Sequence, residues 1–244
     1  MTKDNKKLLG HQHPINTMIA EINNIFAKIG FVFAEGPEVE TEVYNFDRLN
    51  VAKDHTSRDM QDTFWLKPSD VSEPTVLRTH TSSVQARYME SHNPPIRIIV
   101  PGRVFRNEAS DSTHEAEFYQ FEGLCIDKDV NLGHLKGVLE YFLSQLFKGQ
   151  IEIRFRPSYF PFVEPGLEID MRIISGNSKL SGRWIEVMGA GMVHPNVLRD
   201  SGIDPEIYKG FAFGVGVDRL VMMRHDIDDI RFLYSGDLRL INQF

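Results

Sequence analysis

The segment from residue 103 to 122 concentrates side chains that can bind anions, cations and aromatic rings. Its chemically active residues are Arg106, Glu108, His114, Phe118, Gln120 and Glu122. Two β-prone runs flank a polar loop here, and strand side chains alternate between faces, so the even-numbered residues would share one face of a hairpin. Burying such groups without partners costs several kcal/mol. The face is therefore either a solvated surface with salt bridges or a ligand site.

A second segment, GFAFGVGVDRL at 210–220, indicates a strand, a glycine turn and a helix. It is neither a dinucleotide fingerprint, because the third glycine is absent, nor a P-loop, because it lacks GK[ST]. Gly214 and Gly216 allow the backbone to approach a ligand closely. Arg219 would lie near a helix N-terminus, where anions bind. Taken alone, these residues also fit an ordinary turn.

Together the two segments resemble motifs 2 and 3 of the class II aminoacyl-tRNA synthetases. Four further stretches narrow the resemblance to the bacterial phenylalanyl-tRNA synthetase alpha subunit: RTHTSSVQARY (78–88), PGRVFRNE (101–108), SYFPFVEPG (158–166) and GAGMVHPNVL (189–198). EGPEVE at 35–40 resembles motif 1, the dimer-forming element. The resemblance covers roughly residues 13–244. We expect residues 1–12 to be a mobile lead, and the N-terminal helical arm of the family to be absent.

The resemblance implies activation of L-phenylalanine with ATP to give phenylalanyl-adenylate and pyrophosphate, followed by transfer to tRNA(Phe). The amino-acid carboxylate is already ionised at neutral pH, so the reaction needs positioning and charge neutralisation rather than a catalytic base. Arg106 and Arg219 are the implied catalytic residues, on the α-phosphate and γ-phosphate respectively. The residues implied to bind ATP are Arg106, Glu108, His114, Phe118, Glu186 and Arg219.

The resemblance also implies a phenylalanine pocket and a metal ligand. The pocket residues are Trp65, His80, Ser82, Gln120, Glu122, Phe160, Phe162, Val163, Ala212 and Gly214. Phe160 and Phe162 would meet the substrate ring edge-to-face, although without the resemblance they are as well explained as core residues. Glu164 matches a ligand of Mg²⁺, the expected cofactor, shared with a partner subunit. Carboxylates and water are ligands that Mg²⁺ prefers.

The expected partners are a beta subunit, in an assembly of two alpha and two beta chains, together with tRNA(Phe), ATP and L-phenylalanine. The net charge of −7 argues against a dedicated nucleic-acid binder, so we expect tRNA to be held largely by another chain. No apolar run is long enough to span a membrane, and the single cysteine suits a reducing compartment. These features predict a cytoplasmic protein.

The element pattern predicts one α+β domain of mainly antiparallel sheet flanked by helices, as in the class II synthetase catalytic fold. Apolar residues at helical spacing predict helices over 14–29 and 132–149, with Gly30 ending the first, and a further helix is predicted at 81–92. Strands are predicted at 31–40 (bent at Gly36-Pro37), 96–106, 118–126, 151–160, 167–174 and 183–191. Residues 44–64 have no clean period and read as a long loop, which in a domain of this size is often functional.

Two other functions remain as alternatives. One is a relative of the same fold that adenylates a carboxylate without a tRNA substrate. The other is a non-catalytic paralogue, which the presence of both Arg106 and Arg219 disfavours. A zinc site is not supported, because no Cys/His spacing matches a closed site.

Overall fold

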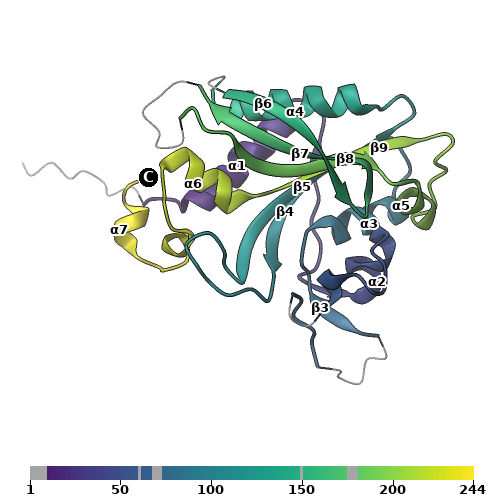
Figure 1. The fold of residues 1–244 in the computed structure, drawn as a ribbon, viewed down its shortest axis with the longest axis horizontal. Coiled ribbons are helices and arrows are strands. Elements are labelled where there is room, and N and C mark those ends of the chain that lie inside the picture. The colour runs from purple at the N-terminus through teal and green to yellow at the C-terminus, as the bar shows by residue number, and fades with distance from the viewer. Residues whose placement is uncertain (1–9, 60–61, 68–72, 149–150, 175–180) are drawn as a thin grey trace, which may run out of the picture.

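A seven-stranded sheet organises the computed structural model, which describes residues 10–59, 62–67, 73–148, 151–174 and 181–244. The strand order is β1-β4-β5-β9-β8-β7-β6, and every pairing is antiparallel except β1 with β4 (Figure 1). The strands are β1 (Val32–Phe33), β4 (Ile96–Phe105), β5 (Glu117–Asp127), β6 (Ile151–Phe160), β7 (Val163–Ile173), β8 (Ile185–Val193) and β9 (Lys209–Gly216). The predicted α+β class, with a mainly antiparallel sheet, is confirmed.

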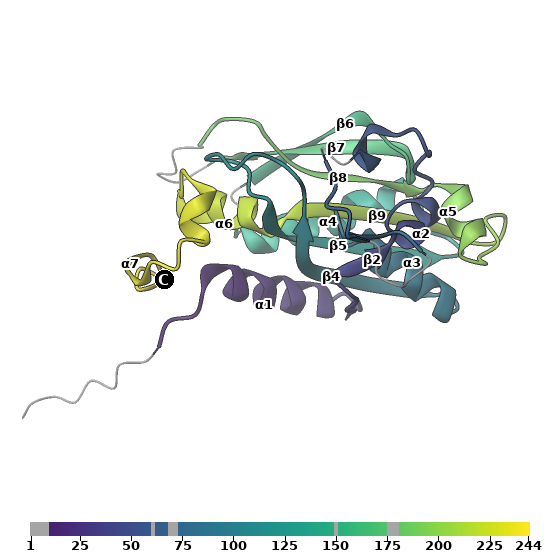
Figure 2. The same cartoon turned by 90° about the horizontal axis from the view of Figure 1, so that it is seen from below.

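Helices cover both faces of this sheet (Figures 1 and 2). The α-helices are α1 (Pro14–Ala27), α2 (Glu42–Asn45), α3 (Ser82–Ser91), α4 (Leu132–Leu146), α5 (Pro195–Asp200), α6 (Val217–His225) and α7 (Leu238–Ile241). Single 3-10 turns form η1 (Asp47–Leu49), η2 (Thr56–Arg58) and η3 (Ile230–Leu233). A small second sheet pairs β2 (Val39–Thr41) with β3 (Thr75–Leu77).

Alternation along β5 separates two hydrophobic layers. Phe121 and Cys125 lie in the larger cluster with α1, α4 and α6, whereas Leu124 and Ile126 pack with α3 and α5 on the opposite face. Helix α1 is stopped as predicted: Gly30 takes the left-handed φ of +82°, and the amide of Phe31 donates to the carbonyl of Phe26. The face that carries α3 is the one that also carries the even-numbered polar residues of β5.

The predicted strand at 31–40 is instead two short strands in different sheets. The chain leaves the main sheet after β1 and enters the small sheet at β2, on either side of Gly36-Pro37. Arg78 fixes this crossing, because its guanidinium donates to the carbonyls of Gly36, Pro37 and Arg103. The chain therefore changes sheet as well as direction at this bend.

The predicted long loop at 44–64 contains short helical turns held by a buried arginine. Arg58 is only 8% exposed and pairs with Glu42 and Asp47, each at 2.7 Å, while its Nε donates to the carbonyl of Ala52. Side-chain interactions of this kind hold a segment that has no hydrophobic periodicity. The segment consequently forms one wall of the cavity described next.

Candidate active site

A cavity of about 940 Å³ opens on the α3 face of the sheet, between the strands and the 46–62 segment. Fifteen of the residues predicted for the site line it: Arg106, Glu108, His114, Phe118, Glu186, Arg219, His80, Ser82, Gln120, Glu122, Phe160, Phe162, Val163, Ala212 and Gly214. They come from strands β5, β9, β8, β7 and β6, from the connections between elements and from the starts of helices α3 and α6, and they span residues 80–219 of the sequence. The fold therefore gathers the predicted ATP and phenylalanine residues around one space.

Two predicted site residues lie outside this lining. Trp65 stacks on Phe46, with ring centroids 6.2 Å apart, and its indole N–H donates to the carbonyl of Arg58, so it supports the wall from behind. Glu164 has a 73% exposed side chain on β7, and its carboxylate lies 3.4 Å from Nε2 of His194. Substrate contact by either side chain remains a prediction.

A row of residues crosses five strands in register, and all but its last member line the floor of the cavity. From β5 to β6 the row reads Glu122, Gly214, Gly189, Glu168 and Arg156. The two central glycines leave bare backbone between acidic side chains. A Cβ at Gly214 would lie 2.9 Å from Cγ of Glu122, and one at Gly189 would lie 2.9 Å from Cζ of Phe160. The glycines therefore make room for the side chains of their neighbours as well as for a ligand.

Glu122 is a buried carboxylate at the inner end of this row, with 6% exposure. Ser82 Oγ donates to its Oε2 at 2.5 Å, and Gln85 Nε2 donates to the same oxygen at 2.8 Å. Burial raises the pKa of Glu122 to about 7, although the hydrogen bond from Ser82 and the charge of Arg106 oppose this shift. The carboxylate is thus poised to gain stability from a cation that reaches it.

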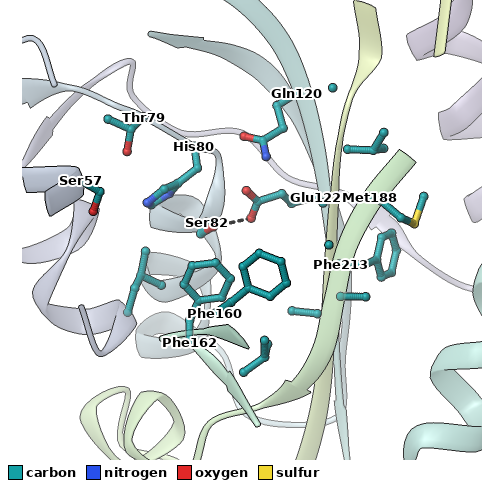
Figure 3. A pocket seen from close by; sticks show the side chains of 18 of the residues that line it. Ser57, Thr79, His80, Ser82, Gln120, Glu122, Phe160, Phe162, Met188 and Phe213 are labelled. Atoms are coloured by element: carbon teal, nitrogen blue, oxygen red, sulfur yellow. Dashed lines mark hydrogen bonds between the residues drawn. The ribbon is translucent and has the colours of Figure 1, made fainter. Parts of the chain in front are cut away.

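Two further residues with buried acceptors, His80 and Gln120, line this part of the cavity (Figure 3). Within the described residues, neither Nδ1 of His80 nor Oε1 of Gln120 has a hydrogen-bond partner, although both atoms are buried. Burial, together with the nearby charge of Arg106, lowers the pKa of His80 to about 3, so its ring is neutral at pH 7. We call His80, Gln120 and Glu122 the ammonium corner, because unpartnered acceptors around one carboxylate suit a group with three N–H donors.

An aromatic wall stands beside the ammonium corner. The rings of Phe160 and Phe162 stack with centroids 6.0 Å apart, and Phe162 lies 6.4 Å from the ring of His80. Both phenylalanines are only partly buried and line the cavity, so they are not plain core residues. Ala212 continues this apolar surface from β9. The wall can hold an aromatic side chain next to an amine.

Arginines mark the outer end of the cavity. Arg106 donates Nε to the carbonyl of Thr79 at 3.3 Å, and its guanidinium carbon lies 5.1 Å from the centre of the Phe118 ring. These contacts are with a neutral carbonyl and an aromatic face, so they leave the positive charge for an anion. Arg219 is exposed in the first turn of α6, close to the helix N-terminus. This end of the cavity can neutralise phosphate charge.

Carboxylates on β7 and β8 complete the outer end. Arg156 is held by the buried carboxylate of Asp170, with Nε–Oδ2 at 2.7 Å, and its Nη2 lies 2.8 Å from Glu168 and 3.7 Å from Glu186. Hydrogen bonding from Arg156 is the main reason that the pKa of Asp170 lies below its usual value. One arginine therefore sets the position of two carboxylates that face the cavity.

Sequence reasoning missed three residues that shape the site. Gln85 lies three positions after Ser82 on α3, and this helical spacing could have indicated that both reach Glu122. Gly189 carries no local signal, because its role depends on the pairing of β8 with β9. Arg156 has no distinguishing signal in the sequence, because its contact with Asp170 depends on the pairing of β6 with β7. That pairing places Asp170 opposite Arg154, two residues before Arg156.

Within the described ranges, no cluster of three or more His, Cys, Asp or Glu side chains is arranged to hold a metal ion. None of the helices in the described part of the chain has the length and apolar character needed to cross a bilayer.

Comparison with known proteins shows the family to which the chain belongs. The family model for the tRNA synthetases class II core domain (F) matches residues 2–244. The chain is 54% identical to the phenylalanine–tRNA ligase alpha subunit of Alkaliphilus metalliredigens, over 97% of this chain and 70% of the relative. The proteins of the same name in Clostridium perfringens and Synechocystis sp. are 50% and 52% identical, over 98% and 96% of this chain and 70% and 67% of theirs.

Proposed function

Because the chain belongs to the family of class II tRNA synthetase core domains, we propose that it is the catalytic alpha subunit of a phenylalanine–tRNA ligase. Such an enzyme activates L-phenylalanine with ATP and transfers it to tRNA. The observation that carries the proposal is the ammonium corner beside the aromatic wall: His80, Gln120 and Glu122 offer acceptors for an amine, next to Phe160 and Phe162.

The amino acid would enter with its ammonium at Glu122. A neutral His80 can accept a hydrogen bond from the ammonium without repelling it, and Gln120 can accept another. The substrate ring would then lie against Phe160 and Phe162, a type of aromatic contact worth about 0.5–1.5 kcal/mol per pair beyond the area buried. Its carboxylate is left pointing toward the outer end of the cavity, where Arg106 lies.

At the outer end, one carboxylate oxygen of the amino acid attacks the α-phosphorus of ATP, and the bond to the bridging oxygen of pyrophosphate breaks. We propose that Arg106 spans the attacking carboxylate and the α-phosphate, because its planar guanidinium can donate to two oxygens at once. Arg219 would neutralise the γ-phosphate of the departing pyrophosphate. No proton has to be removed from the nucleophile, which agrees with a neutral His80 being part of the binding site.

The remaining cavity residues suit the nucleotide. Phe118 presents an aromatic face on which a base can stack, and Arg106 lies over the same ring at 5.1 Å. His114, on the hairpin loop, is oriented by Asp111 with Nδ1–Oδ1 at 3.1 Å and can reach phosphate oxygens. Glu108 and Glu186 would accept hydrogen bonds from the base and the ribose.

The family points to a divalent metal ion, and we propose Mg²⁺. The carboxylates at the outer end, the half-buried Glu168 and the exposed Glu186, fit an ion that is bound by one or two carboxylates, waters and substrate phosphates. When bound, the ion would neutralise phosphate charge. The exposed Glu164 has only His194 within ion-pair distance among the described residues, so its use as a ligand would require donors from another chain.

The name of the relatives implies a partner subunit, and we propose a beta subunit in an α₂β₂ assembly that binds tRNA(Phe). Strand β1 supports self-association of this chain, because it is an edge strand on which Val32 and Phe33 are 52% and 46% exposed. We expect the isolated chain to self-associate and to charge tRNA negligibly. Light scattering combined with an aminoacylation assay checks this, and a well-behaved monomer that aminoacylates tRNA unaided would contradict it.

Amino-acid-dependent ATP–pyrophosphate exchange tests the proposed activity across all twenty amino acids. Phenylalanine should support exchange best, and Arg106→Ala should lower the rate by about 10²–10³-fold, with little rescue by lysine. Arg97→Ala is the matched control, because Arg97 lies on β4, the strand that Arg106 directly follows, but pairs with Asp127 outside the cavity. Near-normal exchange in a folded Arg106→Ala variant would overturn the assignment. Exchange without tRNA charging by the complete complex would favour an adenylating ligase instead.

A further inference from the structure

The two pocket phenylalanines are carried by a tight turn at the edge of the sheet. Phe160 on β6 pairs with Val163 on β7, so Pro161 and Phe162 form the two-residue connection between them. Strand β6 is the last strand of the sheet, which means that the ladder supports this turn from one side only. Its distance from the opposite wall of the cavity must therefore depend on contacts outside the sheet.

One of these contacts comes from the 44–64 segment, which forms that opposite wall. Asn50 Nδ2 donates to the carbonyl of Pro161 at 2.7 Å, and the neighbours of Asn50, Leu49 and Val51, line the cavity. Asn50 ends η1 in the left-handed conformation, with φ of 58° and ψ of 24°. Asparagine adopts this conformation more readily than most residues. Its amide therefore bridges two walls of the cavity that are 111 positions apart in sequence.

The Asn50 amide is itself held in one orientation. Arg199 Nη1 donates to Asn196 Oδ1 at 2.7 Å, and Asn196 Nδ2 donates to Asn50 Oδ1 at 3.0 Å. We call this series, from Arg199 through Asn196 and Asn50 to the Pro161 carbonyl, the amide chain. A guanidinium can only donate and a carbonyl can only accept, so the two ends fix the direction of both amides. Each hydrogen bond thus supports the next.

We propose that Asn50 is a positioning residue for amino-acid recognition: through the amide chain it fixes the turn that carries Phe160 and Phe162 against the opposite wall. The inference rests on the proposed function, since it takes the aromatic wall to be the phenylalanine site. Asn50 touches no reacting atom in this scheme. It sets the width of the ring pocket, whereas the nucleotide end of the cavity, around Arg106 and Arg219, does not depend on it.

The test is ATP–pyrophosphate exchange by the complete enzyme, assembled with its partner subunit, in an Asn50→Gly variant. Glycine keeps the left-handed backbone and removes the side chain with its amide. The KM for phenylalanine should rise about 5- to 10-fold, as expected for losing one hydrogen bond, while the KM for ATP stays within twofold. The kcat/KM for para-chlorophenylalanine relative to that for phenylalanine should also increase, because the width of the ring pocket is then no longer fixed. Asn196→Ala should give a smaller effect in the same direction, since it leaves the bond to Pro161.

Lys148→Gly is the matched control. Lys148 is another left-handed residue, with φ of 56°, and it is exposed at the end of α4, outside the cavity lining. It should leave both KM values unchanged. Should Asn50→Gly fold poorly, Asn50→Asp keeps the size of the residue and an acceptor for Asn196 but has no donor for Pro161, and the same rise in KM is expected.

Three results would overturn the inference. The first is an unchanged KM for phenylalanine in the folded Asn50 variants, and the second is an equal rise in the KM values for phenylalanine and ATP. The third is a loss of melting temperature with unchanged discrimination against para-chlorophenylalanine, which would mark a purely structural role. A wild-type complex that shows no phenylalanine-dependent exchange would refute the proposed function itself, and so is distinguishable from all three.

Discussion

Replacing Glu122 with glutamine should stabilise the chain while removing its affinity for phenylalanine. The two side-chain hydrogen bonds to Glu122, from Ser82 and Gln85, end on one oxygen, so the single carbonyl of glutamine can accept both. Burial raises the pKa of Glu122 from its ordinary value of 4.5 to about 7. Above pH 7 the folded protein must therefore hold a buried charge that burial disfavours, and glutamine removes that cost.

The sign and size of the stability difference follow from the linkage between proton binding and folding. A carboxyl whose pKa is higher in the folded state contributes stability below pH 4.5 and loses it as the pH rises to about 7. The difference between the unfolded and folded pKa values corresponds to about 3 kcal/mol of stability, and about 2 to 3 kcal/mol of this is lost between pH 5 and pH 8. The free energy of unfolding of Glu122→Gln should thus increase relative to wild type by that amount across this range.

Urea unfolding at pH 5, 6, 7 and 8, without substrates, measures this difference directly. In wild type, kcat/KM for phenylalanine should rise about tenfold from pH 6 to pH 8, because kcat/KM reports the ionisation of the free enzyme. Saturating phenylalanine should narrow the stability gap at pH 8 by stabilising wild type alone. A stability difference that stays constant from pH 5 to pH 8 would refute the reasoning, and so would a kcat/KM that is independent of pH.

Two further predictions test the walls of the ring pocket. Gly189→Ala should raise the KM for phenylalanine about tenfold or more and leave the KM for ATP unchanged. The reason is that the new Cβ would lie 2.9 Å from Phe160 Cζ and push the ring into the pocket. Steady-state exchange kinetics check this prediction. Ala212→Gly removes one methyl from the apolar wall and should shift the kcat/KM ratio of para-chlorophenylalanine to phenylalanine by about 10- to 200-fold. An unchanged ratio would mean that Ala212 lies away from the ring.

Local pattern was sufficient to predict the hairpin of β4 and β5. Parity alone placed Phe118, Gln120 and Glu122 on one face and Phe121 and Cys125 on the other, and the structure has this division. The reason is that one face of the hairpin is packed against α1 and α4, so a slip by one residue would bury the polar set. Hydrophobic periodicity also predicted α1 and α4 to within a few residues of their ends.

Pairing between distant strands could not be predicted in the same way. Strand β9 is the last in the sequence, yet it lies between β5 and β8, and this position brings Gly214 between Glu122 and Gly189. Nothing local in the sequence encodes a neighbour that is about ninety residues away. The same limit hid Asn50: its segment has no period, and its role depends on a carbonyl at the far end of the sheet.

The two ends of the cavity would bind groups of opposite charge, and this explains why the empty site lowers the stability of the folded protein. In the proposed binding mode, phenylalanine presents a cation to the inner end and an anion to the outer end. Glu122 would meet the cation from a buried position that disfavours its own charge, and His80 adds no second positive charge because its ring is neutral. Among the described residues, Arg106 contacts a carbonyl and an aromatic face rather than a carboxylate, so an incoming anion would displace no ion pair with them. A site arranged in this way gives up stability when empty and regains it when the substrate binds, which is why removing the charge of Glu122 should stabilise the protein that it disables.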